Sequence, residues 1–514
     1  MNRSLEIFVI FISLILTAAC DSNKQPALLG PSSWLITNAM VVDGTGADAF
    51  LAAVRIEDDK ILAVGELTPL PDESLIDAKG MVLAPGFIDP HSHADDELTE
   101  MLDSISALSQ GITTVVVGLD GFSKHPISDY FSKLEANPPS INVASFSGHN
   151  TLRDLVLGKD YRRKATEQEV KNMVSKLEID MTSGVLGLST GLEYEPGIYS
   201  STDEVITLAR SIAPDGARYV THIRSEDRWF EDAIQETIDI GKAAKIPVHI
   251  SHLKLASSRL LGSAPALLKT LDSALADGII ISADIYPYTA WQSTMLILIP
   301  DRDPENQIEI RKALNEIAPP ESILFSYFAP YPSYIGKTLR EISDDIGEDP
   351  VTVFSSLAKA SKKWTERTGE RGDLIIAGIM DERDIVKLMT WPNTSIGTDG
   401  SLEDKHPRGK GTYPKILSRY VREKRVVSLE TAIYKMTFLP AKQLGIKNRG
   451  LIKPGAYADL LLLDPGNIKD HATMENPSIL SEGILAVWVN GQPTFGGELH
   501  TGRFPGRIIR RGDH

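Results

Sequence analysis

The stretch GFIDPHSHADD, residues 86–96, determines how the rest of the chain is interpreted. It places His91 and His93 one residue apart at the end of an apolar run. Because side chains alternate between the two faces of a β-strand, this spacing puts both imidazoles on one face. Two neutral imidazoles in that position supply half of a binding site for a divalent metal ion. A surface turn with two histidines would have the same letters, so the wider sequence has to decide.

Three further polar residues lie where other strand-like runs end. His222 follows YVT, His252 follows VHIS, and Asp399 follows TSIGT. In a barrel of parallel strands the carboxyl ends form the catalytic face, so these side chains would meet there. An isolated Asp-Gly pair is typical of a plain turn, but four histidines and an aspartate at strand ends predict a metal-dependent active site. His249, three residues before His252, would point to the opposite face of its strand and is expected to be structural.

Between residues 89 and 445, strand-like runs alternate with helical patterns. The strand candidates are TTVVVG (113–118), INVASFSG (141–148), VLGLSTG (185–191), RYVTHIR (218–224), PVHISH (247–252), GIIISADIYPY (278–288), ESILFSYF (321–328) and TSIGTDG (394–400). Such alternation is typical of a parallel sheet with crossover helices, and about eight strands favour a closed barrel. We therefore predict an α/β fold with a (β/α)8 TIM barrel at 89–445. The segment around 300–375 is longer and more charged than one crossover needs, which indicates an insertion.

Short β-rich runs separated by glycine, aspartate and proline occupy both ends of the chain. They cover residues 33–88 and 446–500, and residues 501–514 remain as a tail. Two such regions around an α/β middle predict a small β-sandwich built from both ends.

The segment before residue 33 is typical of an export signal. Its uncharged run, 7–19, is shorter than the roughly 20 apolar residues of a membrane-spanning helix. The run ends in Thr-Ala-Ala directly before Cys20, which resembles a bacterial lipobox, although Thr17 stands where a branched aliphatic residue is usual. We expect a signal peptide at 1–19 and a tether at 20–32. The protein would be exported to the periplasm and anchored to the inner membrane through a lipid on Cys20, or soluble in the periplasm if the signal is an ordinary one.

Composition excludes several classes of protein. The chain has 514 residues, of which 42% are hydrophobic and 24% charged, as in an ordinary globular enzyme. The net charge of −16 argues against nucleic acid or an anionic membrane surface as a partner. A single cysteine excludes an internal disulfide and a cysteine-cluster metal site.

Taken together, these motifs resemble the amidohydrolase superfamily and, more narrowly, the N-acyl-D-amino-acid deacylases (D-aminoacylases). The matching stretches, beginning with PGFIDPHSHADD, include QGITTVVVGLDGFS (110–123), SGHNTLR (147–153), GVLGLSTGLEYEPGIYSSTDE (184–204), THIRSED (221–227), ISHLK (250–254), DIYPYTA (284–290), IGTDG (396–400), the segment 406–437 and KPGAYADLLLLDP (453–465). They span nearly the whole chain after residue 33. The resemblance implies a (β/α)8 barrel with a β-sandwich and with zinc in the barrel mouth.

One departure from the resemblance concerns the metal ligands. The deacylases usually supply a cysteine thiolate where this chain has Asp120, and no lysine that could be carboxylated ends the VLGLSTG run. A carboxylate oxygen also binds zinc, so Asp120 is the candidate anionic ligand. His222 and His252 with Asp120 would form one metal position, and His91 with His93 would hold a second or weaker one that shares Asp120. One or two Zn²⁺ ions are expected, and other divalent metals would fit the same donors.

The resemblance also implies a mechanism and a substrate class. Asp399 would take the proton of a metal-activated water and deliver it to the leaving amine. The substrate would be a small N-acyl-D-amino acid, or a dipeptide with a C-terminal D-residue, with a free α-carboxylate. Arg408 and Tyr286 match residues that bind this carboxylate, and Tyr194 matches a tyrosine near the acyl group. Lys254, two residues after His252, faces the same side of its strand and is a further candidate to bind the carboxylate.

Two alternatives remain open at this point. A cyclic-amide hydrolase of the dihydroorotase or hydantoinase type uses the same barrel, although it normally has the carboxylated lysine. A lipid-anchored binding protein without catalysis is the other alternative, and the replacement of the thiolate by Asp120 is what favours it.

Overall fold

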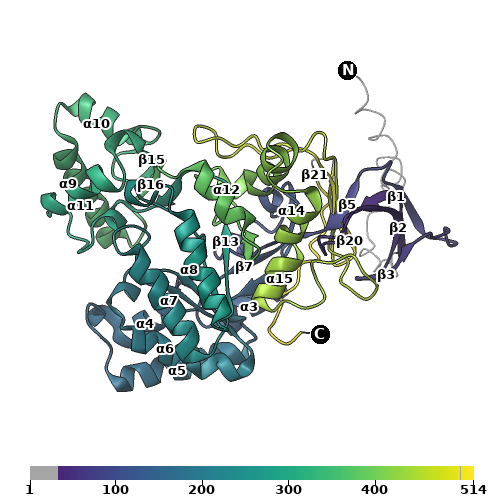
Figure 1. Ribbon diagram of the computed structural model, residues 1–514, viewed down its shortest axis with the longest axis horizontal. Helices are drawn as coiled ribbons and strands as arrows, with labels where there is room; N and C mark the ends of the chain where they lie inside the picture. The colour runs from purple at the N-terminus through teal and green to yellow at the C-terminus, as the bar shows by residue number, and fades with distance from the viewer. Residues whose placement is uncertain (1–32, 498, 514) are drawn as a thin grey trace, which may run out of the picture.

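The computed structural model describes residues 33–497 and 499–513, so the predicted signal peptide, the tether and Cys20 lie outside the described residues. Figure 1 shows three parts: a central barrel, a β domain at one end and a smaller α/β unit at the other. Within the part of the chain that is described, no helix has the length and apolar character needed to cross a bilayer.

The barrel strands are parallel and consist of residues that suit a buried sheet. One of them, ITTVVV, is buried throughout and rich in β-branched residues, as expected of a parallel strand covered on both faces. The strands are β6 (Phe87–Asp89), β7 (Ile112–Val117), β8 (Asn142–Ser145), β9 (Ser147–Gly148), β10 (Gly187–Gly191), β11 (Arg218–His222), β12 (Val248–Ile250), β13 (Ile281–Ile285) and β17 (Thr394–Ile396).

These strands form two arcs, β6-β7-β8 and β9-β10-β11-β12-β13-β17, rather than one continuous ring. Backbone hydrogen bonds join the arcs at both junctions. Leu186 N donates to Ser145 O at 2.9 Å, and Asp399 N donates to His91 O at 2.9 Å. The predicted barrel is thereby confirmed, with β8 and β9 together filling one strand position.

Helices cover the outside of the barrel (Figure 1). They are α2 (Ile105–Leu108), α3 (Ile127–Ala136), α4 (His149–Leu157), α5 (Glu167–Thr182), α6 (Thr202–Ile212), α7 (Phe230–Ala244), α8 (Ala264–Ala276), α12 (Glu382–Thr390), α13 (Arg408–Lys415), α14 (Leu429–Met436) and α15 (Phe438–Leu444). Local sequence sets their ends: Thr166 and Glu169, for example, form a capping box at the start of α5.

One strand candidate belongs to a different sheet from the one expected. ESILFSYF forms β15 (Ile323–Phe328), which pairs antiparallel with β16 (Asp373–Ala377) and not with the barrel. The short β6 takes the remaining barrel position instead. With β14 (Trp291–Ser293), these strands form a three-stranded sheet. The sheet is accompanied by α9 (Gln307–Glu316), α10 (Leu339–Ile346) and α11 (Pro350–Thr368). We call residues 291–377 the insertion unit; it contains the segment expected as an insertion.

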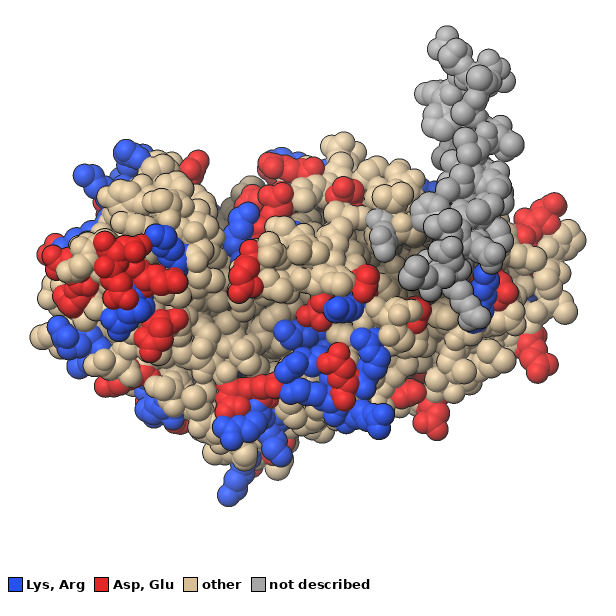
Figure 2. Space-filling model, turned by 90° about the horizontal axis from the view of Figure 1, so that it is seen from above, with Lys and Arg blue, Asp and Glu red and all other residues tan. Residues whose placement is uncertain are grey.

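The β domain combines both ends of the chain, as predicted, in one mixed nine-stranded sheet. Its strands are β1 (Ser33–Val41), β2 (Phe50–Glu57), β3 (Lys60–Gly65), β4 (Ser74–Asp77), β5 (Val82–Pro85), β18 (Leu460–Leu463), β19 (Ile484–Val489), β20 (Gln492–Gly496) and β21 (Leu499–His500). The two ends meet where β5 pairs antiparallel with β18. The following tail returns to the barrel, where Ile509 N donates to Val143 O at 2.8 Å. On the face seen in Figure 2, acidic and basic side chains are interspersed.

Candidate active site and metal centre

The structure brings together all six residues predicted to form the metal site and its base. They come from the ends of five barrel strands: His91 and His93 follow β6, Asp120 follows β7, His222 ends β11, His252 follows β12 and Asp399 follows β17. Asp120, His252 and Asp399 have positive φ angles of 51°, 35° and 51°. Non-glycine residues rarely adopt this backbone conformation, and such strain concentrates at functional sites.

The first group of donors consists of Asp120, His222 and His252. His252 Nε2 lies 3.4 Å from Asp120 Oδ2 and 3.0 Å from His222 Nδ1. His222 Nδ1 lies 3.8 Å from the same carboxylate oxygen. Two imidazole nitrogens and a carboxylate oxygen therefore point at one place, as expected for the first metal position.

The second group consists of His91, His93, Asp120 and Asp399. His91 Nε2 lies 3.5 Å from Asp120 Oδ1 and 3.6 Å from Asp399 Oδ1. His93 Nε2 lies 3.5 Å from Asp120 Oδ2 and 3.1 Å from Asp399 Oδ1. Asp120 thus contributes to both groups, in the shared position that the sequence predicts.

The donors fit a zinc ion. Imidazole nitrogen and carboxylate oxygen are ordinary zinc ligands, and the donor atoms of each group lie within 4.8 Å of one another. Both ring nitrogens of His91 and Oδ1 of Asp120 are buried without a hydrogen-bond partner among the described residues. Because buried polar atoms are normally satisfied, these atoms indicate that a ligand belongs between them.

Neighbouring carboxylates and imidazoles shift one another's pKa values in this site. Burial opposes ionisation of Asp120, but His252 and His91 outweigh burial and hold the pKa of Asp120 well below its usual range. Burial likewise disfavours a charged His93, but hydrogen bonds to Asp120 and Asp399 raise its pKa to about 10. The pKa of His252 also rises to about 10, because Asp399 and Asp120 outweigh burial and the charge of Lys254. Without metal, the site therefore holds protons where cations would bind.

Three buried carboxylates outside the predicted metal set lie behind the histidines. Glu193 Oε2 is 3.1 Å from His222 Nε2. Glu226 Oε1 is 3.2 Å from His252 Nδ1. Asp284 Oδ2 is 3.7 Å from His91 Nδ1 and 2.9 Å from His249 Nε2. Such carboxylates commonly orient metal-binding histidines. In the sequence, Glu226 lies in the THIRSED stretch that resembles the deacylases. Glu193 follows the end of a strand-like run, and this position was the one feature that could have indicated it.

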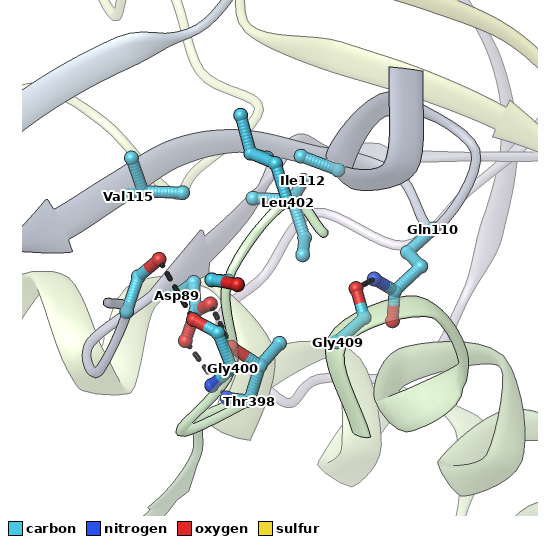
Figure 3. A pocket seen from close by; sticks show the side chains of 11 residues that line it. Asp89, Gln110, Ile112, Val115, Thr398, Gly400, Leu402 and Gly409 are labelled. Atoms are coloured by element: carbon cyan, nitrogen blue, oxygen red, sulfur yellow. Dashed lines mark hydrogen bonds between the residues drawn. The ribbon is translucent and has the colours of Figure 1, made fainter. Parts of the chain in front are cut away.

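Another unpredicted carboxylate joins the first and last barrel strands. Asp89 accepts hydrogen bonds from Thr398 N at 2.9 Å and Thr398 Oγ1 at 2.6 Å, as Figure 3 shows. Burial raises the pKa of Asp89 to about 7. The small cavity beside this pair offers about 10 Å³ for water centres, near the lower limit for one water molecule, so it does not hold the substrate. The hydrogen bonds between Asp89 and Thr398 hold the strand end that carries His91 against the strand end that carries Asp399.

The predicted substrate-binding residues surround this centre. Lys254 Nζ donates to Glu226 Oε1 at 2.6 Å and lies 2.8 Å from His252 Nδ1. Arg408 donates to Asp399 Oδ2 at 2.5 Å and lies over the ring of Tyr286, 5.2 Å from its centroid. The Tyr286 hydroxyl is buried and has no hydrogen-bond partner within residues 33–497 and 499–513. The Tyr194 ring lies 4.4 Å from the ring of His222. Two cations and two tyrosines thus lie around the metal ligands.

Three other polar residues of the stretches that match the deacylases lie outside the metal centre. Arg224 pairs with Glu236 at 2.8 Å. His149 binds Glu204 at 2.8 Å in a buried cluster with Arg153. His406 is fully buried, and its Nδ1 accepts a hydrogen bond from Arg408 N at 3.1 Å. It supports the start of α13, which carries Arg408.

The comparisons with known proteins agree with this geometry. The model of the amidohydrolase family matches residues 74–290 and 388–495, leaving out the insertion unit. The D-aminoacylase of Alcaligenes xylosoxydans xylosoxydans is 33% identical over 506 residues, which cover 94% of this chain and 98% of that protein. The N-acyl-D-aspartate deacylase of the same organism is 34% identical over 508 residues, 94% of this chain and 96% of that protein.

A solved structure extends the similarity to the whole fold. The N-acyl-D-glutamate deacylase of Bordetella bronchiseptica, solved with zinc and a phosphonate inhibitor that mimics the tetrahedral intermediate, has a TM-score of 0.83 and 34% identity. The match covers 93% of this chain and 99% of that one. The chain therefore belongs to the amidohydrolase family and, within it, to the N-acyl-D-amino-acid deacylases.

Proposed function

We propose that the protein is a zinc-dependent hydrolase of linear amides that removes the acyl group from N-acyl-D-amino acids or cleaves dipeptides with a C-terminal D-residue. The convergence of His91, His93, His222, His252 and Asp399 on Asp120 is the observation that carries the proposal. The relatives named above act on N-acyl-D-amino acids, which supports the substrate class.

The site residues indicate how the metal and the side chains would share the chemistry of amide hydrolysis. Zinc held by the two donor groups would supply Lewis-acid chemistry, which makes water more acidic and an amide carbonyl more electrophilic. Asp399 directs Oδ1 at His91 and His93, while its Oδ2 is held by Arg408. Oδ1 is therefore the oxygen that accepts the proton of the attacking water and later gives it to the amine nitrogen.

The charge state of Asp399 suits this role. Burial opposes its ionisation, but Arg408 and His252 outweigh burial and keep the pKa of Asp399 well below its usual range. The group is therefore an anion at neutral pH, ready to accept a proton.

Lys254, Arg408 and Tyr286 form the candidate binding place for the substrate carboxylate. Burial opposes the charges of Lys254 and Arg408, but neighbouring carboxylates outweigh it and raise both pKa values. Both side chains therefore stay cationic, and the free Tyr286 hydroxyl adds a donor. Tyr194, above His222, would line the acyl side of the site.

A panel of amides tests the proposal. Residues 20–514 with zinc added would be assayed for amine release from N-acetyl-D-amino acids, their L-enantiomers, L-Xaa-D-Xaa dipeptides and cyclic amides. Turnover of D-configured linear amides, lost in Asp399→Asn at unchanged zinc content, is the expected result. Turnover of cyclic amides alone would reassign the protein to hydantoinase-like chemistry, and no turnover with zinc bound would overturn the proposal.

We also propose that the chain is exported and anchored to the inner membrane through Cys20. The support is the uncharged run 7–19 followed by Thr-Ala-Ala-Cys. The full-length protein is expected in the membrane fraction and Cys20→Ser in the soluble periplasmic fraction. Identical fractionation of the two proteins would contradict lipidation.

A further inference from the structure

The Glu193 side chain lies directly behind a metal ligand. Its Oε2 accepts a hydrogen bond from His222 Nε2 at 3.1 Å, on the side of the ring opposite to Asp120. The other ring nitrogen, Nδ1, faces His252 Nε2 at 3.0 Å. A ring with its proton on Nε2 presents the lone pair of Nδ1 to the donor group. The contact with Glu193 selects this tautomer and this ring orientation.

The backbone of Glu193 is held on two sides. The preceding residue, Leu192, donates its N–H to His222 O at 3.1 Å. On the other side, Arg302 of the insertion unit donates to Glu193 O. The second guanidinium nitrogen of Arg302 bonds to the carbonyl oxygens of Leu296, Ile297 and Ile299 at 2.8–2.9 Å. Arg302 thus connects the insertion unit to the residue that supports His222.

The Glu193 carboxylate is buried without the cationic side chain that usually accompanies a buried acidic group. Its side chain is buried, with 7% of the residue exposed, yet no lysine or arginine in residues 33–497 and 499–513 forms an ion pair with it. Glu226 differs, because its Oε1 is shared between His252 and Lys254. A buried carboxylate costs free energy unless it is hydrogen-bonded, and His222 is the partner that Glu193 has.

We propose that Glu193 is a positioning residue that fixes His222 for metal binding, and that Arg302 fixes Glu193 from the insertion unit. The inference rests on the zinc chemistry of the proposed function but not on the identity of the substrate. It makes the insertion unit part of the support of the metal centre.

Zinc affinity in a His93→Ala background tests the proposal, because this background weakens the second donor group. Glu193→Ala should raise the zinc Kd by about 10- to 100-fold, measured by competition with a chromophoric chelator. Glu193→Gln keeps an acceptor oxygen for Nε2–H and should lose less. The absorption spectrum of the Co²⁺ form should change in Glu193→Ala, because the geometry of a ligand changes.

Glu195→Gln is the matched control. Glu195 lies two residues further along the same loop, and its carboxylate binds Tyr199 at 2.6 Å and Arg162 at 3.1 Å rather than a metal ligand. Its substitution should leave the zinc Kd and the Co²⁺ spectrum unchanged. Equal effects of the Glu193 and Glu195 variants would overturn the proposal.

A double-mutant cycle tests the connection to the insertion unit. Arg302→Lys cannot reach four carbonyl oxygens and should also raise the zinc Kd. In Arg302→Lys/Glu193→Ala the two effects should be less than additive, because both act through His222. Full additivity would contradict the connection. The outcomes for the inference and for the proposed function are distinct. If Glu193→Ala leaves the zinc Kd unchanged while amide turnover persists, the inference is overturned. If zinc binding is weakened but no amide is turned over, the proposed function alone is overturned.

Discussion

Arg408 donates a hydrogen bond to Asp399 Oδ2 at 2.5 Å and lies 3.5 Å from Asp404. The arginine therefore lies between two buried carboxylates and holds the proposed base from the side opposite to the histidines. This pair connects α13, which begins at Arg408, to the last barrel strand. Arg408 consequently has two tasks, the orientation of Asp399 and the binding of a substrate carboxylate.

Substitution of Arg408 by methionine should affect both tasks. A hydrogen bond to a charged group contributes about 1.5–3 kcal/mol, so kcat/KM should fall by at least about 10-fold. Arg408 lowers the pKa of Asp399, and its removal raises that pKa. The acidic limb of the pH profile of kcat/KM should therefore move to higher pH. A lower kcat/KM with an unmoved acidic limb would show that Arg408 binds substrate without acting on Asp399.

Asp399→Asn should lower kcat by about 10²- to 10⁴-fold, the usual contribution of a general base. The amide keeps the shape of the carboxylate but does not accept a proton. Zinc content, measured by elemental analysis, should remain that of the unaltered protein, because His222, His252 and Asp120 remain. Loss of zinc together with activity would instead make Asp399 a ligand first and a base second.

Zinc affinity of the metal-free protein should increase with pH. The pKa values of His93 and His252 are raised to about 10 in the metal-free site, so both rings carry protons at neutral pH. Binding has to release these protons, and the apparent Kd should fall as the pH rises from 6 to 9. Calorimetry in buffers with different ionisation enthalpies measures the release. A Kd independent of pH would contradict this description of the site.

Replacement of Asp120 by cysteine should convert the site from an oxygen to a sulfur donor. A thiolate is softer than a carboxylate, so the affinity for Cd²⁺ should rise relative to that for Mg²⁺ or Mn²⁺. A sulfur-to-metal charge-transfer band in the Cd²⁺ form would show ligation directly. Asp120→Ala is the control and should lose both metal and turnover. Unchanged metal binding in the alanine variant would exclude Asp120 as a ligand.

Patterns of neighbouring residues in the sequence were sufficient to predict the barrel, the two-ended β domain and the convergence of four histidines with Asp399, whereas Asp120 was predicted from the resemblance to the deacylases. Two patterns were especially informative: the one-residue spacing of His91 and His93, and the continuous apolar run of β7. By contrast, ESILFSYF has the pattern of a strand, but a local pattern does not specify which sheet it joins. Its partner is β16, about 50 residues further along the chain.

The carboxylates behind the histidines could not be predicted for a related reason. Glu193, Asp284 and Asp89 are single acidic residues without periodicity or a neighbouring partner in the sequence. Their meaning comes from contacts with His222, His91 and Thr398, which are distant in the chain and adjacent only in the folded barrel.

The junction between β6 and β17 has a consequence for biosynthesis. Asp89 and Thr398 are 309 residues apart, and their contact brings the histidine pair to Asp399. Closing so long a loop is slow compared with local helix and hairpin formation. A nascent chain therefore exposes His91 and His93 long before their catalytic partner has been synthesised. Hydrolytic competence arises only when the first and last barrel strands meet, so activity is a direct reporter of completed folding.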